Sequence, residues 1–196
     1  MKEIIERRSI RKYKSDTVRK EDIEAIILAV TKAPSAKNRQ PWKYIVYTAD
    51  AKNQLLNEME KGLIREQDEK QLLPKLQNGL ADAFYTLHVM REAPVLIMIV
   101  NTNGQSPFED IEVDERVTEI CDTLSIGASV ENMLLTATEL GYGTLWIANT
   151  CFAYEELVAY MGITGQLIGA VSLGLPAETP NPRPRKSMEE VVEYRA

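Results

Sequence analysis

Histidine and cysteine are scarce in this chain of 196 residues, which holds one histidine, His88, and two cysteines, Cys121 and Cys151. The cysteines lie far apart, without a CxxC motif or a nearby pair of histidines. They fit reduced thiols in a cytoplasmic protein better than a metal site. His88 is expected to be a packed or surface residue. Because the sequence has no metal-ligand cluster and no nucleophile motif, it lacks the residues that common hydrolases use.

Long apolar runs are also missing. The best run, residues 95–100, has the length of a strand, whereas a membrane-spanning helix needs about 20 apolar residues. The N-terminus carries Glu3 and Glu6 and no apolar block before a cleavage site, so it does not resemble a secretory signal. We therefore expect a cytoplasmic protein with no membrane partner.

The composition, 44% hydrophobic and 27% charged, is that of a globular protein. No flexible linker and no internal repeat divides the chain. The sequence therefore predicts one domain over residues 1–196, with residues 1–14 and 179–196 as extended anchoring arms.

Positive charge is concentrated at the N-terminus. Residues 1–20 hold eight basic and three acidic side chains, although the whole chain has a net charge of −6. Nucleic-acid binding requires a broader basic face, so we expect no nucleic-acid partner. A local anion site suits this pattern better, and a merely solvated basic N-terminus is the alternative.

Hydrophobic periodicity predicts helices and strands along the whole chain. A short helix over residues 1–8 is expected to pack Ile4 and Ile5 inward. Residues 64–92 are expected to be helical in pieces, broken by Pro74 and Gly79. The remaining helices are expected at 20–31, 50–63 (capped by Asp50), 115–140 and 154–161, and the strands at 43–48, 95–101, 144–149 and 167–173.

Residues 33–42 form the most distinctive stretch, APSAKNRQPW. Its two prolines oppose a helix, so we expect an ordered loop. A hydroxyl, amides and free backbone N–H groups would equip this loop to bind a planar, polar-edged ligand. The alternative is a connecting loop in which Trp42 packs into the core.

Arginines alternate near both ends of the chain. In an extended chain Arg7, Ser9 and Arg11 share one face, and paired guanidinium donors suit phosphate oxygens. Arg183 and Arg185 alternate in the proline-rich tail. This tail could complete a phosphate clamp or serve only as a tether.

Four stretches in the same order resemble the nitroreductase-like flavoprotein family. The resemblance covers nearly the whole chain and rests on RRSIRKY (7–13), APSAKNRQPWKYIVYT (33–48), GASVENMLLTATELGYGTLWIAN (127–149) and LGLPAETPNPRPRKSMEEVV (173–192). It implies an α+β fold with a central, mainly antiparallel sheet flanked by helices. It also implies an intertwined homodimer with FMN bound at the interface.

The resemblance also assigns roles to residues. One group would hold the FMN phosphate and ribityl chain: Arg7, Arg8, Ser9, Arg11, Arg183 and Arg185. A second group would line the flavin from the partner subunit: Pro34, Ser35, Ala36 and Asn38. Ile147, Ala148 and Asn149 would bring backbone N–H groups to the N5–O4 edge of the ring. Ala148-Asn149 depart from the glutamate-glycine or glycine common in the family, which leaves substrate choice open.

The resemblance implies an FMN-dependent NAD(P)H oxidoreductase with ping-pong hydride transfer through flavin N5 to a nitroaromatic, a quinone or a similar small-molecule acceptor. No side chain need act as acid or base, because the flavin carries the redox chemistry. Since the sequence has no GxGxxG motif, NAD(P)H is expected to bind transiently. The alternatives are a non-catalytic flavin-binding or sequestering protein, and a specialised dehalogenating or flavin-cleaving relative. The sequence does not choose the acceptor, NADH over NADPH, or one- over two-electron reduction.

Overall fold

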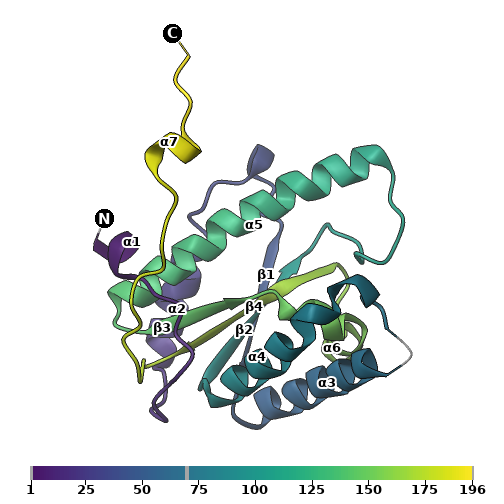
Figure 1. Ribbon diagram of the computed structural model, residues 1–196, viewed down its shortest axis with the longest axis horizontal. Coiled ribbons are helices and arrows are strands. Elements are labelled where there is room, and N and C mark those ends of the chain that lie inside the picture. Colours follow the sequence, from purple (N-terminus) through teal and green to yellow (C-terminus); the bar gives the residue numbers. More distant parts are fainter. Residues whose placement is uncertain (1, 69–70, 196) are drawn as a thin grey trace.

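A four-stranded antiparallel sheet forms the centre of the molecule in the computed structural model, which describes residues 2–68 and 71–195 (Figure 1). The strands lie in the order β1-β2-β4-β3. Their bounds are β1 Trp42–Thr48, β2 Val95–Asn101, β3 Gly143–Ile147 and β4 Gln166–Gly174. The mainly antiparallel sheet expected from the sequence is confirmed.

Strand β2 is apolar at almost every position because both of its faces are covered by helices. All seven of its residues are buried. Leu96 and Met98 face one hydrophobic core, and Val95, Ile97 and Ile99 face the other. This alternation follows from the two-residue period of a strand.

Helices cover the two faces of the sheet. Those on one face are α3 Ala49–Gln67, α4 Leu80–Glu92 and α6 Tyr154–Met161, and those on the other are α2 Lys20–Val30 and α5 Val113–Glu139 (Figure 1). Short 3₁₀ turns occur at η1 Ala36–Asn38, η2 Pro74–Gly79 and η3 Asn149–Ala153. None of the helices in the described ranges is long and apolar enough to cross a membrane. Residues 69 and 70, within the stretch expected to be helical in pieces, lie outside the described residues.

The N-terminal and C-terminal arms lie on the same side of the molecule, and the C-terminal arm extends away from the sheet past α5 (Figure 1). The N-terminal arm carries α1 Lys2–Glu6, and the C-terminal arm carries α7 Met188–Val191, so neither arm is extended throughout. Met1, which the expected first helix included, lies outside the described residues.

The expected inward packing of Ile4 and Ile5 is wrong. Their side chains are 60% and 69% exposed in the single chain. Helix α1 has only five residues, none of them buried, and it lies against α5, so it offers these two side chains no core within its own chain.

The expected cap of α3 is also wrong. The residue before the helix is Thr48, and Asp50 lies within the first turn. The other boundaries differ from the expectation by a few residues, and α6 and β2 agree with it.

Candidate functional site

The N-terminal arm docks on the edge strand β3. Ser9 pairs with Thr144 in a parallel bridge, and the Ile10 N–H donates to the Thr144 carbonyl at 2.9 Å. Ile10 is buried there because Gly143 has no side chain: a Cβ atom at residue 143 would lie 2.6 Å from Ile10 Cγ1. Arg11 is thereby held next to the end of β3.

The C-terminal arm runs beside the N-terminal arm. The Arg11 N–H donates to Glu178 Oε1 at 2.6 Å, and the Ala177 N–H donates to the Lys12 carbonyl at 2.9 Å. These contacts join segments more than 160 residues apart in the sequence. They bring the arginines of both arms to one place.

Tyr13 is part of the same junction. Burial raises the pKa of its phenol, and the nearby Glu178 carboxylate adds to this effect. Tyr13 is therefore protonated at neutral pH, and its hydroxyl donates to the Ile10 carbonyl at 2.9 Å. This hydrogen bond, within the N-terminal arm, helps to fix the path of residues 10–13.

A cavity of about 310 Å³ lies between the two arms, and we call it the arginine cavity. No carboxylate is among the described residues that line it. Its walls are Ile4, Ile5, Arg7, Arg8, Ser9, Arg11, Pro180, Asn181, Pro182, Arg183 and Arg185. Five guanidinium groups around one small cavity create a strongly positive potential suited to a phosphate dianion.

The positive charge of this cavity is nearly uncompensated. Arg7 Nε lies 3.9 Å from Glu131 Oε1, at the outer limit of an ion pair. Across residues 2–68 and 71–195, no carboxylate forms an ion pair with Arg8, Arg11, Arg183 or Arg185. The guanidinium groups of Arg8 and Arg185 each donate to two backbone carbonyls of the described chain. Closely spaced cations without counter-ions favour binding of an anion.

A second cavity, of about 150 Å³, lies at the end of β3, and we call it the strand-end cavity. It is lined by Arg11, Asp82, Thr86, Leu145, Trp146, Ile147, Ala148 and Asn149. Arg11 lines both cavities, so they are neighbours. A ligand with a phosphate in the first cavity could extend toward the second.

The strand expected at residues 144–149 ends earlier than predicted, at Ile147. Asn149 begins η3, and its Nδ2 donates to Asp82 Oδ2 and Thr86 Oγ1, each at 3.0 Å. The first N–H groups of such a turn have no acceptor within it, so their acceptors must come from outside the turn. The side chain of Asn149 is held by α4, and Asn149 is among the residues that line the strand-end cavity.

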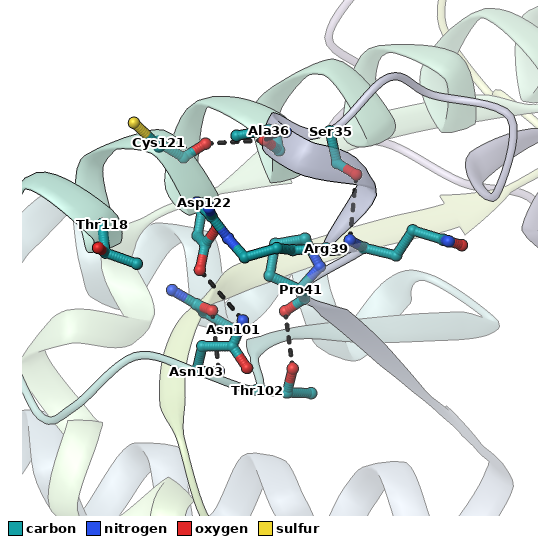
Figure 2. Close-up of polar contacts among 12 residues, drawn as sticks. Ser35, Ala36, Arg39, Pro41, Asn101, Thr102, Asn103, Thr118, Cys121 and Asp122 are labelled. Carbon is teal, nitrogen blue, oxygen red and sulfur yellow. Dashed lines mark hydrogen bonds and ion pairs between the residues drawn. The ribbon is translucent and has the colours of Figure 1, made fainter. Parts of the chain in front are cut away.

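The loop of residues 34–42 lies away from the two cavities, against α5 (Figure 2). The Ala36 N–H donates to Ser125 Oγ at 3.2 Å, and Arg39 binds Asp122. Pro34, Ser35, Ala36 and Asn38 line neither of the two cavities. The chain thus brings both arms and residues 147–149 together but leaves this loop apart from them.

Trp42 packs partly buried against the core formed with α2 and α5, as the simpler reading of this loop expected. His88 is exposed, and its Nε2 lies 3.2 Å from Glu92 Oε1. Both cysteines are free and half-buried.

Sequence reasoning missed three carboxylates near the expected site residues: Asp82 at the strand-end cavity, Glu178 between the arms, and Asp122 beneath the loop. Asp82 and Thr86 are four residues apart and so share a face of α4. That spacing was visible in the sequence. The partners of Glu178 and Asp122 lie 167 and 83 residues away, and no local pattern indicates them.

Comparison with known proteins gives a consistent result. A family model described as the Nitroreductase family matches residues 4–175. An NADH dehydrogenase of Thermus thermophilus is 28% identical over 201 residues, covering 97% of this chain and 93% of that protein.

Solved structures share the fold over the full chain. The BluB-like flavoprotein from Clostridium difficile 630 has 26% identity and a TM-score of 0.74, covering 100% of this chain and 98% of its own. The FMN-dependent nitroreductase NfnB from Mycobacterium smegmatis, solved in complex with NADPH, has a TM-score of 0.73 and covers 100% of this chain and 97% of its own. Its identity is 19%, so that likeness is one of fold.

Proposed function

Because this chain belongs to the nitroreductase family, we propose that it is an FMN-dependent oxidoreductase that takes electrons from NAD(P)H and passes them to a nitroaromatic, a quinone or a similar acceptor. The observation that carries this proposal is the arginine cavity. Five arginines and Ser9 surround a volume of about 310 Å³ with no carboxylate among its described lining residues. Such a site suits the terminal phosphate of FMN.

The residues fit this cofactor in two regions. The FMN phosphate and ribityl chain would be held by Arg7, Arg8, Ser9, Arg11, Arg183 and Arg185. Backbone N–H groups of residues 147–149 would bind the N5–O4 edge of the ring. The neighbouring positions of the two cavities, joined at Arg11, support this assignment.

Bound FMN would supply the redox chemistry by accepting a hydride at N5 and returning electrons to the acceptor. The chain would bind and orient the cofactor. Its backbone donors at residues 147–149 and the positive charge of Arg11 would stabilise negative charge on the bound cofactor.

We further propose a homodimer in which Pro34, Ser35, Ala36 and Asn38 of one subunit complete the site of the other. An exposed apolar stripe on α5 supports this, formed by Val113, Val117, Ile120 and Leu124. Their spacing of four, three and four residues puts them on one face of the helix. An apolar stripe of this kind commonly marks a protein interface.

Steady-state turnover tests the function. The protein reconstituted with FMN should be yellow and should oxidise NADH or NADPH in the presence of a nitro or quinone acceptor. A panel of both nicotinamides against several acceptors would identify the preferred pair. A protein that stays colourless after addition of FMN would overturn the proposal.

Two other outcomes separate the alternatives. FMN binding without NAD(P)H oxidation under any acceptor would indicate a flavin-sequestering protein. A product other than the reduced nitro compound or quinone, found after anaerobic reduction, would indicate a dehalogenating or flavin-cleaving relative. Ala148 and Asn149, which differ from the usual family residues, are the positions that keep these alternatives open.

A further inference from the structure

The loop of residues 34–42 has an unusual backbone. Three of its residues that are not glycine have positive φ angles: Lys37 at 54°, Asn38 at 53° and Gln40 at 48°. Side chains with a Cβ atom rarely adopt this left-handed region, and each such residue raises the energy of the folded chain. A loop with three of them keeps its shape only when other contacts hold it.

One buried carboxylate, Asp122, accepts hydrogen bonds from the loop (Figure 2). Arg39 donates to Asp122 Oδ1 from Nε at 2.8 Å and from Nη2 at 2.6 Å. Asn103 Nδ2 donates to the other oxygen, Oδ2, at 3.1 Å. Both carboxylate oxygens of Asp122 are therefore bonded, and its side chain is only 1% exposed.

The ends of the loop are fixed around this pair. The Ala36 N–H donates to Ser125 Oγ at 3.2 Å, one helical turn after Asp122 on α5. The Gln40 N–H donates to Ser35 Oγ at 3.0 Å, within the loop itself. On the other side, the Thr102 N–H donates to the Pro41 carbonyl at 2.8 Å.

Asp122 stands apart from these neutral contacts because it is a charge removed from water. A buried carboxylate requires a cation and further hydrogen-bond donors, which here come from Arg39 of the loop and from Asn103 in the turn after β2. In the present path of the loop, Arg39 satisfies it with two hydrogen bonds. The charge of Asp122 thus favours one loop conformation over others.

We propose that Asp122 and Arg39 are positioning residues that hold loop 34–42 in the conformation required of a flavin wall. The role of the loop as a flavin wall rests on the proposed function. The role of the pair in holding the loop does not. The pair itself would not touch the cofactor. It would set the backbone of residues 35–38, which the proposed dimer presents to the other subunit.

The informative variant is Asp122→Asn. It keeps the shape of the side chain, but its amide group would face either Asn103 or Arg39 with a donor against a donor. We expect faster hydrogen exchange of the amides of residues 36–40 in the FMN-free protein. We also expect FMN to bind about tenfold more weakly, a change equivalent to about 1.4 kcal/mol.

Asp22→Asn provides a matched control. Asp22 is likewise buried and binds Arg19 through two hydrogen bonds of 2.8 Å, but it lies in the first turn of α2 and does not contact the loop. This variant should lower thermal stability without changing loop exchange or FMN affinity. Arg39→Lys serves as the second variant if Asp122→Asn fails to fold, because it keeps the charge and loses the paired donation.

The outcomes are distinct. Unchanged exchange of residues 36–40 in both test variants would overturn the positioning role, and so would faster exchange with unchanged FMN affinity. If Asp22→Asn changed loop exchange and FMN affinity as much as Asp122→Asn does, the Asp122–Arg39 pair would only stabilise the fold in general. That result would also overturn the proposal. If the wild-type protein binds no FMN, the proposed function fails, while the exchange measurement still decides whether the pair holds the loop.

Discussion

Arg11 lies where the two cavities meet, since its side chain lines both of them. Its backbone N–H donates to Glu178 Oε1, and within the described residues its guanidinium makes a single hydrogen bond, of 3.4 Å, to the Ser9 carbonyl. The side chain is thus positioned by the fold and left available to a ligand. Arg183 lines the same cavity from the C-terminal arm and is exposed.

Replacing either arginine by alanine should weaken FMN binding. A charge-assisted hydrogen bond to phosphate contributes about 1.5–3 kcal/mol, so Arg11→Ala and Arg183→Ala should each lower affinity at least tenfold. The measurement is titration of the FMN-free protein followed by flavin fluorescence. Arg195→Ala is the control, because Arg195 belongs to the same tail but pairs with Glu193 away from the cavity. Unchanged affinity in both test variants would exclude these arginines from the site.

Glu66 shows what a buried carboxylate does elsewhere in the chain. Its side chain has no exposed surface and accepts hydrogen bonds from the Leu72 N–H at 2.8 Å and the Leu73 N–H at 3.3 Å. Burial alone would raise the pKa of this carboxyl, but these bonds and the Arg65 guanidinium hold the pKa below its ordinary value. Glu66 therefore ties the C-terminal end of α3 to the segment that enters η2.

Glu66→Gln should lower the free energy of unfolding at pH 7 by about 1.5–3 kcal/mol, because the charge-assisted bonds are lost. The folded-state pKa lies below the unfolded value near 4.5, so the stabilisation is present above that pH and is lost as pH falls through the folded-state pKa. The difference between wild type and variant should narrow below about pH 4.5. Denaturant titrations between pH 3 and 7 measure this difference.

The exposed Glu24, paired with Lys20 on α2, supplies the control variant Glu24→Gln, which should change stability by less than about 0.5 kcal/mol at any pH. If the difference in unfolding free energy between wild type and Glu66→Gln stayed constant down to pH 3, the stabilising role of the Glu66 charge would be contradicted.

At the scale of elements, the contact between the N-terminal arm and β3 decides where the arginines lie. The arm has no helix or sheet of its own at residues 7–14 beyond two isolated bridges, one of them to Thr144. Its docking depends on the space left by Gly143, into which Ile10 packs. A side chain at residue 143 would push the arm away from the sheet edge.

Gly143→Ala should therefore weaken FMN binding as well as stability. The new methyl would meet Ile10 within 2.6 Å, and crowding of this kind in a packed site costs about 1–3 kcal/mol. Gly79→Ala is a fair control, because its methyl would meet only Phe152 at 3.4 Å in ordinary contact. Thermal unfolding and FMN titration of both variants measure the effects. Equal FMN affinity for wild type and Gly143→Ala would show that the arm's docking does not position the site.

At the scale of the whole molecule, one chain holds two parts of the candidate site and carries the third part elsewhere. Both arms and residues 147–149 adjoin the cavities, while loop 34–42 packs on α5. The same helix presents the apolar stripe that ends at Leu124, which is 70% exposed. Packing of two copies through α5 would cover the stripe and could bring a loop to the other chain's cavities.

Leu124→Glu should therefore shift the protein toward a monomer and lower FMN affinity at the same time. A charge in an apolar interface loses its hydration without gaining a partner, which opposes association. Sedimentation velocity measures the oligomeric state, and titration measures the affinity. Ile64→Glu is the control, because Ile64 is half exposed on α3, across the sheet from α5. Full FMN affinity in a monomeric variant would contradict a site shared between subunits.

Local patterns in the sequence determined the elements well. The apolar run at residues 95–101, the helical spacing at 154–161 and the prolines around residue 34 act within a few residues, so a strand, a helix and a loop could be predicted there. The alternating arginines predicted an anion site formed by both chain ends, which is the prediction that the FMN titrations test. These features depend on backbone geometry and side-chain period, which neighbouring residues fix.

Only the tertiary structure decided which distant segments meet. It placed Glu178 against Arg11 and Asp122 beneath Arg39, and it left Ile4 and Ile5 outside the core of their own chain. It also ended β3 at Ile147, two residues before Asn149, which begins η3 and is hydrogen-bonded to α4. Such contacts depend on packing between elements and on the need of a buried charge for hydrogen-bond partners. Neither can be predicted from the residues that are neighbours in the sequence.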